Sequence, residues 1–325
     1  TGFDGLDPTA VRREAEKHGI VPAALSLQGA HANTLNLSFA RIREPIENTL
    51  KFAKEAGFKN VPVLGGCVAS PLDQPKNIII ENLKRAGDMA EKYGITREEC
   101  DKIAVRSHNL ACKAIDEGIF KDEIVPVVLK TRKGEKVITD DEHPIRNCTM
   151  ETLAKLKPAF KKDGVITAAN ASGINDAAAA VILMSWEKCQ ELGKKPMAKL
   201  VTCVAEGVAP EVMGLGPAVA MPKALKAAGL KWEDIDYFEV NEAFSAQVLG
   251  VERMLKEDYG YVVDWDKTNK FGSGIALGHP VGCTALRIIV TLVYEMIRSD
   301  YKYGMASLCV GGGPALASIW TRDFS

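Results

Sequence analysis

The C-terminal part of the chain alternates apolar runs of strand length with amphipathic runs of helix length, and this alternation constrains the fold more than any other feature. We predict strands at residues 199–205, 237–240, 304–309 and 315–321, and helices at 217–228, 242–256 and 281–297. Such an alternation is typical of α/β proteins, in which helices pack on a sheet. We therefore predict a compact α/β domain of βαβαβαββ-like order over residues 197–325. Its Gly-rich loops follow strand ends, where α/β proteins place their sites.

The residues before this domain show a less regular pattern. Thr96 and Glu99 form a capping box, which predicts a helix from there to about Gly118. Residues 119–165 are polar and loop-rich with short elements, and residues 168–183 predict a small-residue loop running into an alanine-rich helix. We accordingly predict three parts: a short α/β segment of uncertain origin at 1–90, a loop-rich and helical region at 91–196, and the C-terminal domain at 197–325.

Composition excludes several classes of function. The 325 residues carry 41 Lys and Arg against 42 Asp and Glu, so the chain lacks the basic footprint of a protein that binds nucleic acid or an anionic membrane. No apolar run approaches the roughly 18 residues of a spanning helix, and no secretory signal pattern is present. The 8 cysteines are scattered without CxxC pairs, which indicates free thiols in a reducing compartment. We expect a cytoplasmic protein without a metal site.

Three loops of the C-terminal domain carry residues suited to chemistry. They are Asn241-Glu242-Ala243-Phe244, Gly278-His279-Pro280 and Cys309-Val310-Gly311-Gly312-Gly313. Taken singly, each has an ordinary structural explanation: an acidic helix N-terminus, a hydrogen-bonded histidine and a buried small thiol. The glycines of the third loop allow a backbone N–H to approach a ligand closely.

The order and spacing of these loops are much more specific than any one of them. NEAFSAQ (241–247), GSGIALGHPVGCTALR (272–287) and LCVGGGPALA (308–317) follow one another, and three further strings precede them: YGITREECDKIAVRSHNLA (93–111), TAANASGINDAAAAVILMS (167–185) and MGLGP (213–217). With these strings the chain resembles the thiolase family, the acetyl-CoA acetyltransferases and 3-ketoacyl-CoA thiolases. The resemblance covers about residues 88–325.

The resemblance implies a role for five residues. Cys309 would be the acid/base cysteine that moves the proton of the substrate α-carbon or of the incoming thiol. His279 would activate the nucleophile and donate to the thioester oxygen, and Asn241 would hold the water that completes this first oxyanion site. The backbone N–H of Gly311 would belong to a second oxyanion site, and Ser172 would contact the pantetheine arm of coenzyme A. Fixed donors of this kind suit Claisen chemistry, because they stabilise an oxyanion.

The chain departs from the family pattern at several small residues and at the nucleophile. Ala169, Ala177 and Ala285 stand where the family usually has Gly, and Pro314-Ala315 replaces a pair that normally ends in Gly. The family's nucleophilic Cys lies in a Cys-x-Ser-Gly-type turn before a helix, and that turn is missing.

The other cysteines do not fill this gap. Cys67 stands in Cys-Val-Ala-Ser, which matches the turn poorly, and Cys100 and Cys112 lie inside helical patterns, where we interpret them as structural. The nucleophile therefore stays unassigned.

The first 90 residues resemble a different family. GLDPTAVRREAEKHGIVPAALSLQGAHANTL (5–35) and IENTLKFAKEAGFKNVPVLGG (46–66) are similar to the sugar-isomerase and endonuclease type of (β/α)8 barrel. The metal-binding acids of that family come from later strands, and His31 alone makes no metal site. Two hypotheses stay open: a barrel fragment joined to a thiolase body at about residues 81–95, or a divergent thiolase with a remodelled N-terminal half.

The resemblance implies a function with two alternatives. The family reaction is reversible thiolysis of a 3-ketoacyl-CoA or Claisen condensation of acyl-CoA units, with coenzyme A thioesters as substrates and no metal or redox cofactor. It also implies a homo-oligomer, formed through the sheet of the half that carries the nucleophile. The alternatives are a catalytically inactive coenzyme A-binding or chimeric protein, and a fragment of a metal-dependent sugar isomerase.

Overall fold

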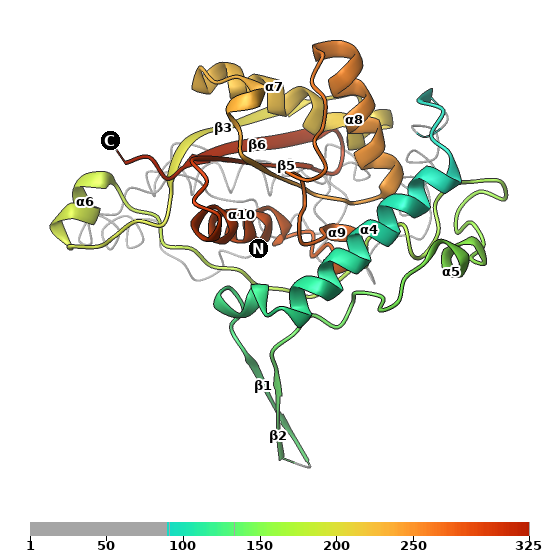
Figure 1. Cartoon of the computed structure of the whole chain (residues 1–325), viewed down its shortest axis with the longest axis horizontal. Coiled ribbons are helices and arrows are strands. Elements are labelled where there is room, and N and C mark those ends of the chain that lie inside the picture. The colour runs from blue at the N-terminus through green and yellow to red at the C-terminus, as the bar shows by residue number, and fades with distance from the viewer. Residues whose placement is uncertain (1–89, 91, 133, 325) are drawn as a thin grey trace, which may run out of the picture. The chain divides into compact units, whose positions relative to one another are not determined.

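The computed structural model describes residues 90, 92–132 and 134–324, which all belong to one compact unit, Ile80–Ser325. The predictions for residues 1–89, including the barrel resemblance, His31 and Cys67, lie outside these residues. Within the described part, the α/β fold class is confirmed (Figure 1). Among the described helices, none combines the length and apolarity that crossing a bilayer requires.

A four-stranded sheet forms the centre of the C-terminal domain. Its strands are β3 (Lys199–Gly207), β4 (Tyr237–Val240), β5 (Tyr303–Cys309) and β6 (Pro314–Thr321), and their order across the sheet is β3-β6-β5-β4. The hairpin of β5 and β6 is antiparallel, as is the pair β3–β6, whereas β4 and β5 run parallel. The carboxyl ends of β4 and β5 therefore meet at the same edge of the sheet.

Helices cover both faces of this sheet. The side chains of Phe238 and Met305 belong to the core that also contains α7 (Gly216–Ala228) and α8 (Ser245–Tyr259). Their neighbours Tyr237 and Ala306 belong to a second core with α10 (Thr284–Arg298). Because successive strand residues point to opposite faces, α7 and α8 lie on one face and α10 on the other (Figure 1).

The long helix α4 (Arg97–Asp116) packs against α8 and the short helix α9 (Gly274–Leu277). Thr96 accepts a hydrogen bond from the backbone of Glu99, whose side chain reaches back to the backbone of Thr96. The predicted capping box is therefore confirmed. The buried face of α4 carries Ser107, which reaches the site described below.

The region between α4 and β3 consists of short elements. They are η1 (Ile119–Asp122), β1 (Val127–Thr131), β2 (Gly134–Ile138), α5 (Met150–Ala154) and α6 (Trp186–Glu191), and two further 3-10 turns, η2 (Pro210–Leu215) and η3 (Trp232–Asp234), lie within the C-terminal domain. The antiparallel hairpin β1–β2 projects away from the other described elements (Figure 1).

The alanine-rich helix predicted within residues 168–183 is wrong. Residues 172–185 form neither helix nor strand, and the side chains of Ile182 and Leu183 are 87% and 73% exposed. A helix in water takes most of its stability from burying an apolar face. No such face is buried here, and the helix propensity of alanine alone does not hold the segment.

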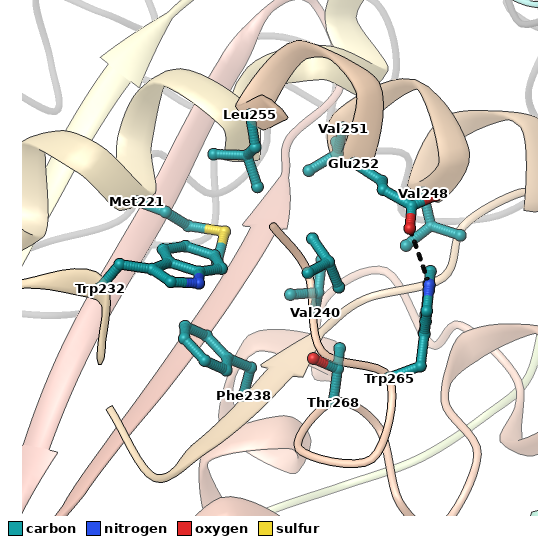
Figure 2. A pocket seen from close by; sticks show the side chains of 11 residues that line it. Met221, Trp232, Phe238, Val240, Val248, Val251, Glu252, Leu255, Trp265 and Thr268 are labelled. Carbon is teal, nitrogen blue, oxygen red and sulfur yellow. Dashed lines mark hydrogen bonds between the residues drawn. The ribbon is translucent and has the colours of Figure 1, made fainter. Parts of the chain in front are cut away.

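A small apolar cavity lies between α7, α8 and β4 (Figure 2). Its volume is about 10 Å³, which is room for about one water molecule. Trp232 stacks on Phe238 at a centroid distance of 4.6 Å, and Trp265 donates to Glu252 beside it. The cavity contains none of the predicted site residues and is too small for an acyl-CoA.

Substituting Gly216 should test the contact between α7 and the sheet. A Cβ at this position would lie 2.4 Å from the Cβ of Ala315, a buried residue of β6. We expect Gly216→Ala to lower the free energy of unfolding by about 1–3 kcal/mol in urea titrations, because it overpacks this contact. Gly207→Ala, in open space on β3, is the matched control and should change the value by less than about 1 kcal/mol. Equal effects of both changes would contradict the prediction.

Candidate functional site

Two of the predicted residues lie at the ends of the parallel strand pair. Asn241 directly follows β4, and its backbone N–H donates to the carbonyl oxygen of Ser307 on β5 at 3.0 Å. Cys309 is the last residue of β5. The parallel pairing therefore brings a buried amide and a thiol to one edge of the sheet, as expected for an α/β site.

His279 reaches the same edge from the loop after α9. Its Nε2 atom lies 3.4 Å from Nδ2 of Asn241. Gly278 precedes it with φ 88°, and a Cβ there would lie 2.2 Å from Oδ1 of Asn175. Both the left-handed backbone and the close approach of Asn175 require glycine at this position.

Ser172 belongs to a segment that links these two loops. Its backbone N–H donates to the carbonyl oxygen of Ala243 at 3.1 Å, and the N–H of His279 donates to the carbonyl oxygen of Gly173 at 2.9 Å. The segment thus forms hydrogen bonds to both the loop of Asn241 and the loop of His279. Gly311 lies exposed in the turn between β5 and β6, which is closed by a 2.7 Å bond from Val310 N–H to Pro314 O.

Burial keeps His279 neutral. Burial is the main cause that lowers the pKa of His279 to about 4, and the positive charge of Arg287 lowers it further. The imidazole is therefore uncharged near pH 7 and can accept a proton. Its Nδ1 atom lies 2.7 Å from Oγ1 of Thr284.

Burial shifts the pKa of Cys309 upwards, opposite to its effect on the pKa of His279. It raises the pKa of the thiol to about 11, against the smaller lowering effect of a backbone hydrogen bond. The resting thiol therefore carries its proton near pH 7. The protonated thiol can act as a general acid, and the thiolate that remains after it loses its proton can then act as a general base.

A buried carboxylate anchors the loop of Asn241. Glu242 is completely buried and accepts hydrogen bonds from Ser107 of α4 at 2.5 Å and from Asn269 at 2.9 Å. Burial raises the pKa of Glu242, and these two bonds lower it. Asn269 also binds both backbone polar groups of Val240, so it ties the end of β4 to this anchor.

A second buried carboxylate lies under the first turn of α10. Glu239 of β4 is completely buried, and its Oε2 atom lies 3.9 Å from Nη1 of Arg287. Burial raises the pKa of Glu239 to about 8, with Arg287 and a hydrogen bond from Tyr237 acting against it. With a pKa of about 8 the carboxyl of Glu239 is mostly protonated near pH 7, so this contact between Arg287 and a largely neutral carboxyl connects β4, which ends just before Asn241, to the helix that follows His279.

Five of the other described cysteines have thiols with a raised pKa. Burial raises the pKa of Cys100 to about 12 and that of Cys148 to about 11. It also raises the pKa of Cys112, Cys203 and Cys283. Nucleophilic cysteines have a lowered pKa instead, so none of these five is a suitable nucleophile in the resting protein.

No group of His, Cys, Asp and Glu within residues 90, 92–132 and 134–324 has the arrangement of a metal site. The site instead contains two buried side-chain oxygens without a hydrogen-bond partner among these residues, Oδ1 of Asn241 and Oδ1 of Asn175. Buried acceptors of this kind usually hold a water or a ligand group.

Sequence reasoning missed several residues that shape this site. Asn175 and Thr284 lie within the strings quoted above, but nothing in their type singled them out. His143 donates through Nδ1 to the carbonyl oxygen of Ala276 at 2.8 Å, and it comes from the loop-rich region, where no pattern marks it. Only the folded chain brings these side chains to the loop of His279.

Comparison with known proteins adds two family models. Residues 83–187 match the model described as "Thiolase, N-terminal domain", and residues 194–322 match "Thiolase, C-terminal domain". The comparisons give no support to a sugar-isomerase barrel fragment in residues 1–90.

Individual relatives agree with these models. The acetyl-CoA acetyltransferase of Syntrophomonas wolfei subsp. wolfei is 56% identical over 234 residues, which are 72% of this chain and 58% of that protein. That of Pseudomonas aeruginosa is 48% identical over 241 residues, or 73% of this chain and 59% of that protein. The chain thus spans about three fifths of the length of these curated relatives.

Two solved structures align over nearly the whole chain. The Bacillus anthracis acetyl-CoA acetyltransferase is 34% identical, with a TM-score of 0.73 over 98% of this chain and 94% of that one. Human mitochondrial 3-ketoacyl-CoA thiolase is 29% identical, with a TM-score of 0.71 over 98% and 92%.

The protonation of His279 can be followed by NMR. Because burial and Arg287 hold its pKa at about 4, we expect its ring resonances to stay constant from pH 8 to pH 5.5 and to shift only in more acidic solution. His279→Gln, which removes the resonance, identifies it. A midpoint between pH 6 and 7, the value of an exposed imidazole, would contradict the prediction.

The protonation of Cys309 can be followed by alkylation. With a pKa of about 11, only a small fraction of the thiol ionises near neutrality, so its reaction with iodoacetamide should be slow at pH 7. The rate should rise about tenfold per pH unit up to about pH 10, because the thiolate is the reacting form. Mass spectrometry of the peptide that contains Cys309 gives the rate, with Cys309→Ser as the blank. A plateau below pH 8 would show a resting thiolate.

Proposed function

The chain belongs to the thiolase family, and from this premise we propose that it is an acyltransferase acting on acyl-coenzyme A thioesters. Its reaction is the reversible thiolysis of a 3-ketoacyl-CoA or, in reverse, the Claisen condensation of two acyl-CoA units. The observation that carries the proposal is the meeting of Asn241, His279 and Cys309 at one edge of the sheet, as described above. The reaction needs no metal or redox cofactor, because its charges are stabilised by hydrogen bonds.

Cys309 acts as the acid when the carbon–carbon bond breaks. In thiolysis the electron pair of that bond moves to the α-carbon of the departing acyl-CoA, and the Cys309 thiol gives its proton to this carbon. The raised pKa of Cys309 supports this role, since the resting thiol holds the proton that the step requires. The thiolate that results then takes the proton of the incoming coenzyme A thiol, which restores the starting state.

His279 and Asn241 act at the thioester oxygen. His279 is neutral and half-buried, so it can accept a proton from a thiol and, once charged, donate to an oxyanion. The unpartnered Oδ1 of Asn241 supports a bound water as the second donor of this oxyanion site. A water held there donates one proton to Oδ1 and the other to the substrate.

Gly311 and Ser172 serve the rest of the substrate. Gly311 is exposed in the turn that follows Cys309, where its backbone N–H can donate to a second oxyanion. Ser172 is half-buried beside the loop of Asn241, which suits a contact with the pantetheine arm of coenzyme A. Ala315, one of the departures from the family pattern, is buried and points its methyl group towards Gly216 of α7.

The acyl-enzyme step needs a nucleophilic thiolate, and the raised pKa values make Cys100, Cys112, Cys148, Cys203 and Cys283 unsuited to that role. Cys67, outside the described residues, is the first candidate. The raised pKa values of the five other thiols discussed above favour a second proposal, a coenzyme A-binding protein of the same fold without turnover. Homo-oligomerisation remains a proposal drawn from the family alone.

Thiolysis of acetoacetyl-CoA by free coenzyme A tests the proposal directly. We expect turnover by the full chain and a fall of about 10²–10⁴-fold in kcat for Cys309→Ala and for His279→Ala, the usual contribution of an acid–base group. Cys203→Ala, an exposed cysteine of β3, is the matched control and should keep full activity.

The alternative proposal makes a different prediction for the same assay. Well-folded protein that melts cooperatively, binds coenzyme A and does not turn over would overturn the enzymatic function and favour the binding protein. In that case Cys67→Ala would have no effect on the assay, whereas a working enzyme that uses this thiol would lose its activity.

A further inference from the structure

The hydroxyl of Thr284 connects His279 to the first turn of α10. Thr284 is completely buried and is the first residue of that helix. Its Oγ1 atom lies 2.7 Å from Nδ1 of His279 and 3.0 Å from the carbonyl oxygen of Pro280. Pro280 is four residues earlier, before the turn that leads into α10, so the second contact has the i to i−4 spacing of a threonine back-bond.

The proton count of this arrangement determines which nitrogen of His279 carries hydrogen. A hydroxyl has one proton, and the Pro280 carbonyl can only accept. This carbonyl also accepts the backbone N–H groups of Cys283 and Thr284. With its proton directed to Pro280, Thr284 must accept a hydrogen bond from Nδ1–H of His279.

The contact made by the second ring nitrogen of His279, Nε2, also agrees with a proton on Nδ1. Nε2 of His279 faces Nδ2 of Asn241, an amide donor, at 3.4 Å. A donor opposite Nε2 requires a lone pair on this nitrogen, and the lone pair is present when the neutral ring carries its proton on Nδ1.

We propose that Thr284 is a positioning residue that holds neutral His279 as the Nδ1–H tautomer, with the Nε2 lone pair facing the substrate edge beside Asn241. The role of this lone pair rests on the proposed function. When a thiol gives its proton to Nε2, the S–H bond breaks and an Nε2–H bond forms, while Nδ1 keeps its proton on Thr284. The charged ring then carries a proton on each nitrogen: Nδ1–H still donates to Thr284, and Nε2–H becomes a donor for the oxyanion.

Long-range ¹H–¹⁵N NMR of the histidine rings at pH 7 tests the tautomer without any turnover. The signals of His279 are assigned by their loss in His279→Gln, and we expect protonated Nδ1 and unprotonated Nε2. His108 is an internal reference for the opposite tautomer: its Nδ1 accepts from the N–H of Ile145, and its Nε2 donates to Ala169 O, both at 3.2 Å. A wild-type spectrum with the proton of His279 on Nε2 would overturn the proposal.

Three variants separate the hydroxyl of Thr284 from the packing around it. Thr284→Val keeps the shape and removes the hydroxyl, so His279 should lose its single Nδ1–H tautomer and give a mixture. Thr284→Ser keeps the hydroxyl and should give the wild-type spectrum. Thr291→Val is the matched control, because it removes a buried hydroxyl of the same helix that bonds to Glu123 and not to His279.

The activity readout distinguishes this proposal from the proposed function. If the chain turns over, Thr284→Val should lower kcat by about tenfold or more with little change in KM, and Thr284→Ser and Thr291→Val should stay near wild type. If the wild type does not turn over, the proposed function fails, and the NMR result still decides the tautomer. An unchanged Nδ1–H tautomer in Thr284→Val would overturn the role of Thr284. If that variant does not fold, loss of the tautomer in Thr284→Ser would overturn it.

Discussion

The parallel pairing of β4 and β5 is the constraint on which the rest of the site depends. It places the end of β4, where Asn241 lies, beside the end of β5, where Cys309 lies. An antiparallel pair would have sent these two residues to opposite edges of the sheet. The pairing also satisfies the backbone of Asn241, whose N–H donates to the carbonyl oxygen of Ser307. The side-chain amide of Asn241 is not needed for this pairing and can make other contacts.

Parallel strands alone do not bring His279 to this edge, and buried polar contacts complete the arrangement. Glu242 joins the loop of Asn241 to Ser107 of α4, and Arg287 joins α10 to Glu239 of β4. Removing one partner of such a buried contact leaves a polar group unsatisfied, which is costly. The contacts therefore hold the loops in one relative position, and the 3.4 Å separation of Asn241 and His279 is a consequence of their combined geometry.

Features that depend on interactions between residues close in the sequence could be predicted from the sequence alone. Thr96 and Glu99 cap α4 within one helical turn, and the glycines after Cys309 form the turn of the β5–β6 hairpin. Prediction from the sequence failed for residues 172–185, where alanine predicts a helix but no packed face supports one. It also missed Thr284 and Ser107, because their roles depend on contacts made by the folded chain and not on a pattern of residue types.

Burial of the site has one consequence for its chemistry that follows from both titratable groups together. Removal of water lowers the pKa of His279 and raises that of Cys309, so each group is uncharged at rest. An ion pair between them would require the Cys309 thiol, whose pKa is raised, to protonate an imidazole whose pKa is lowered, and burial disfavours both charges. The charge must therefore arrive with the substrate, as the oxyanion or the carbanion forms. A neutral site with fixed donors stabilises that charge without first losing an internal ion pair, and this is the electrostatic arrangement that Claisen chemistry requires.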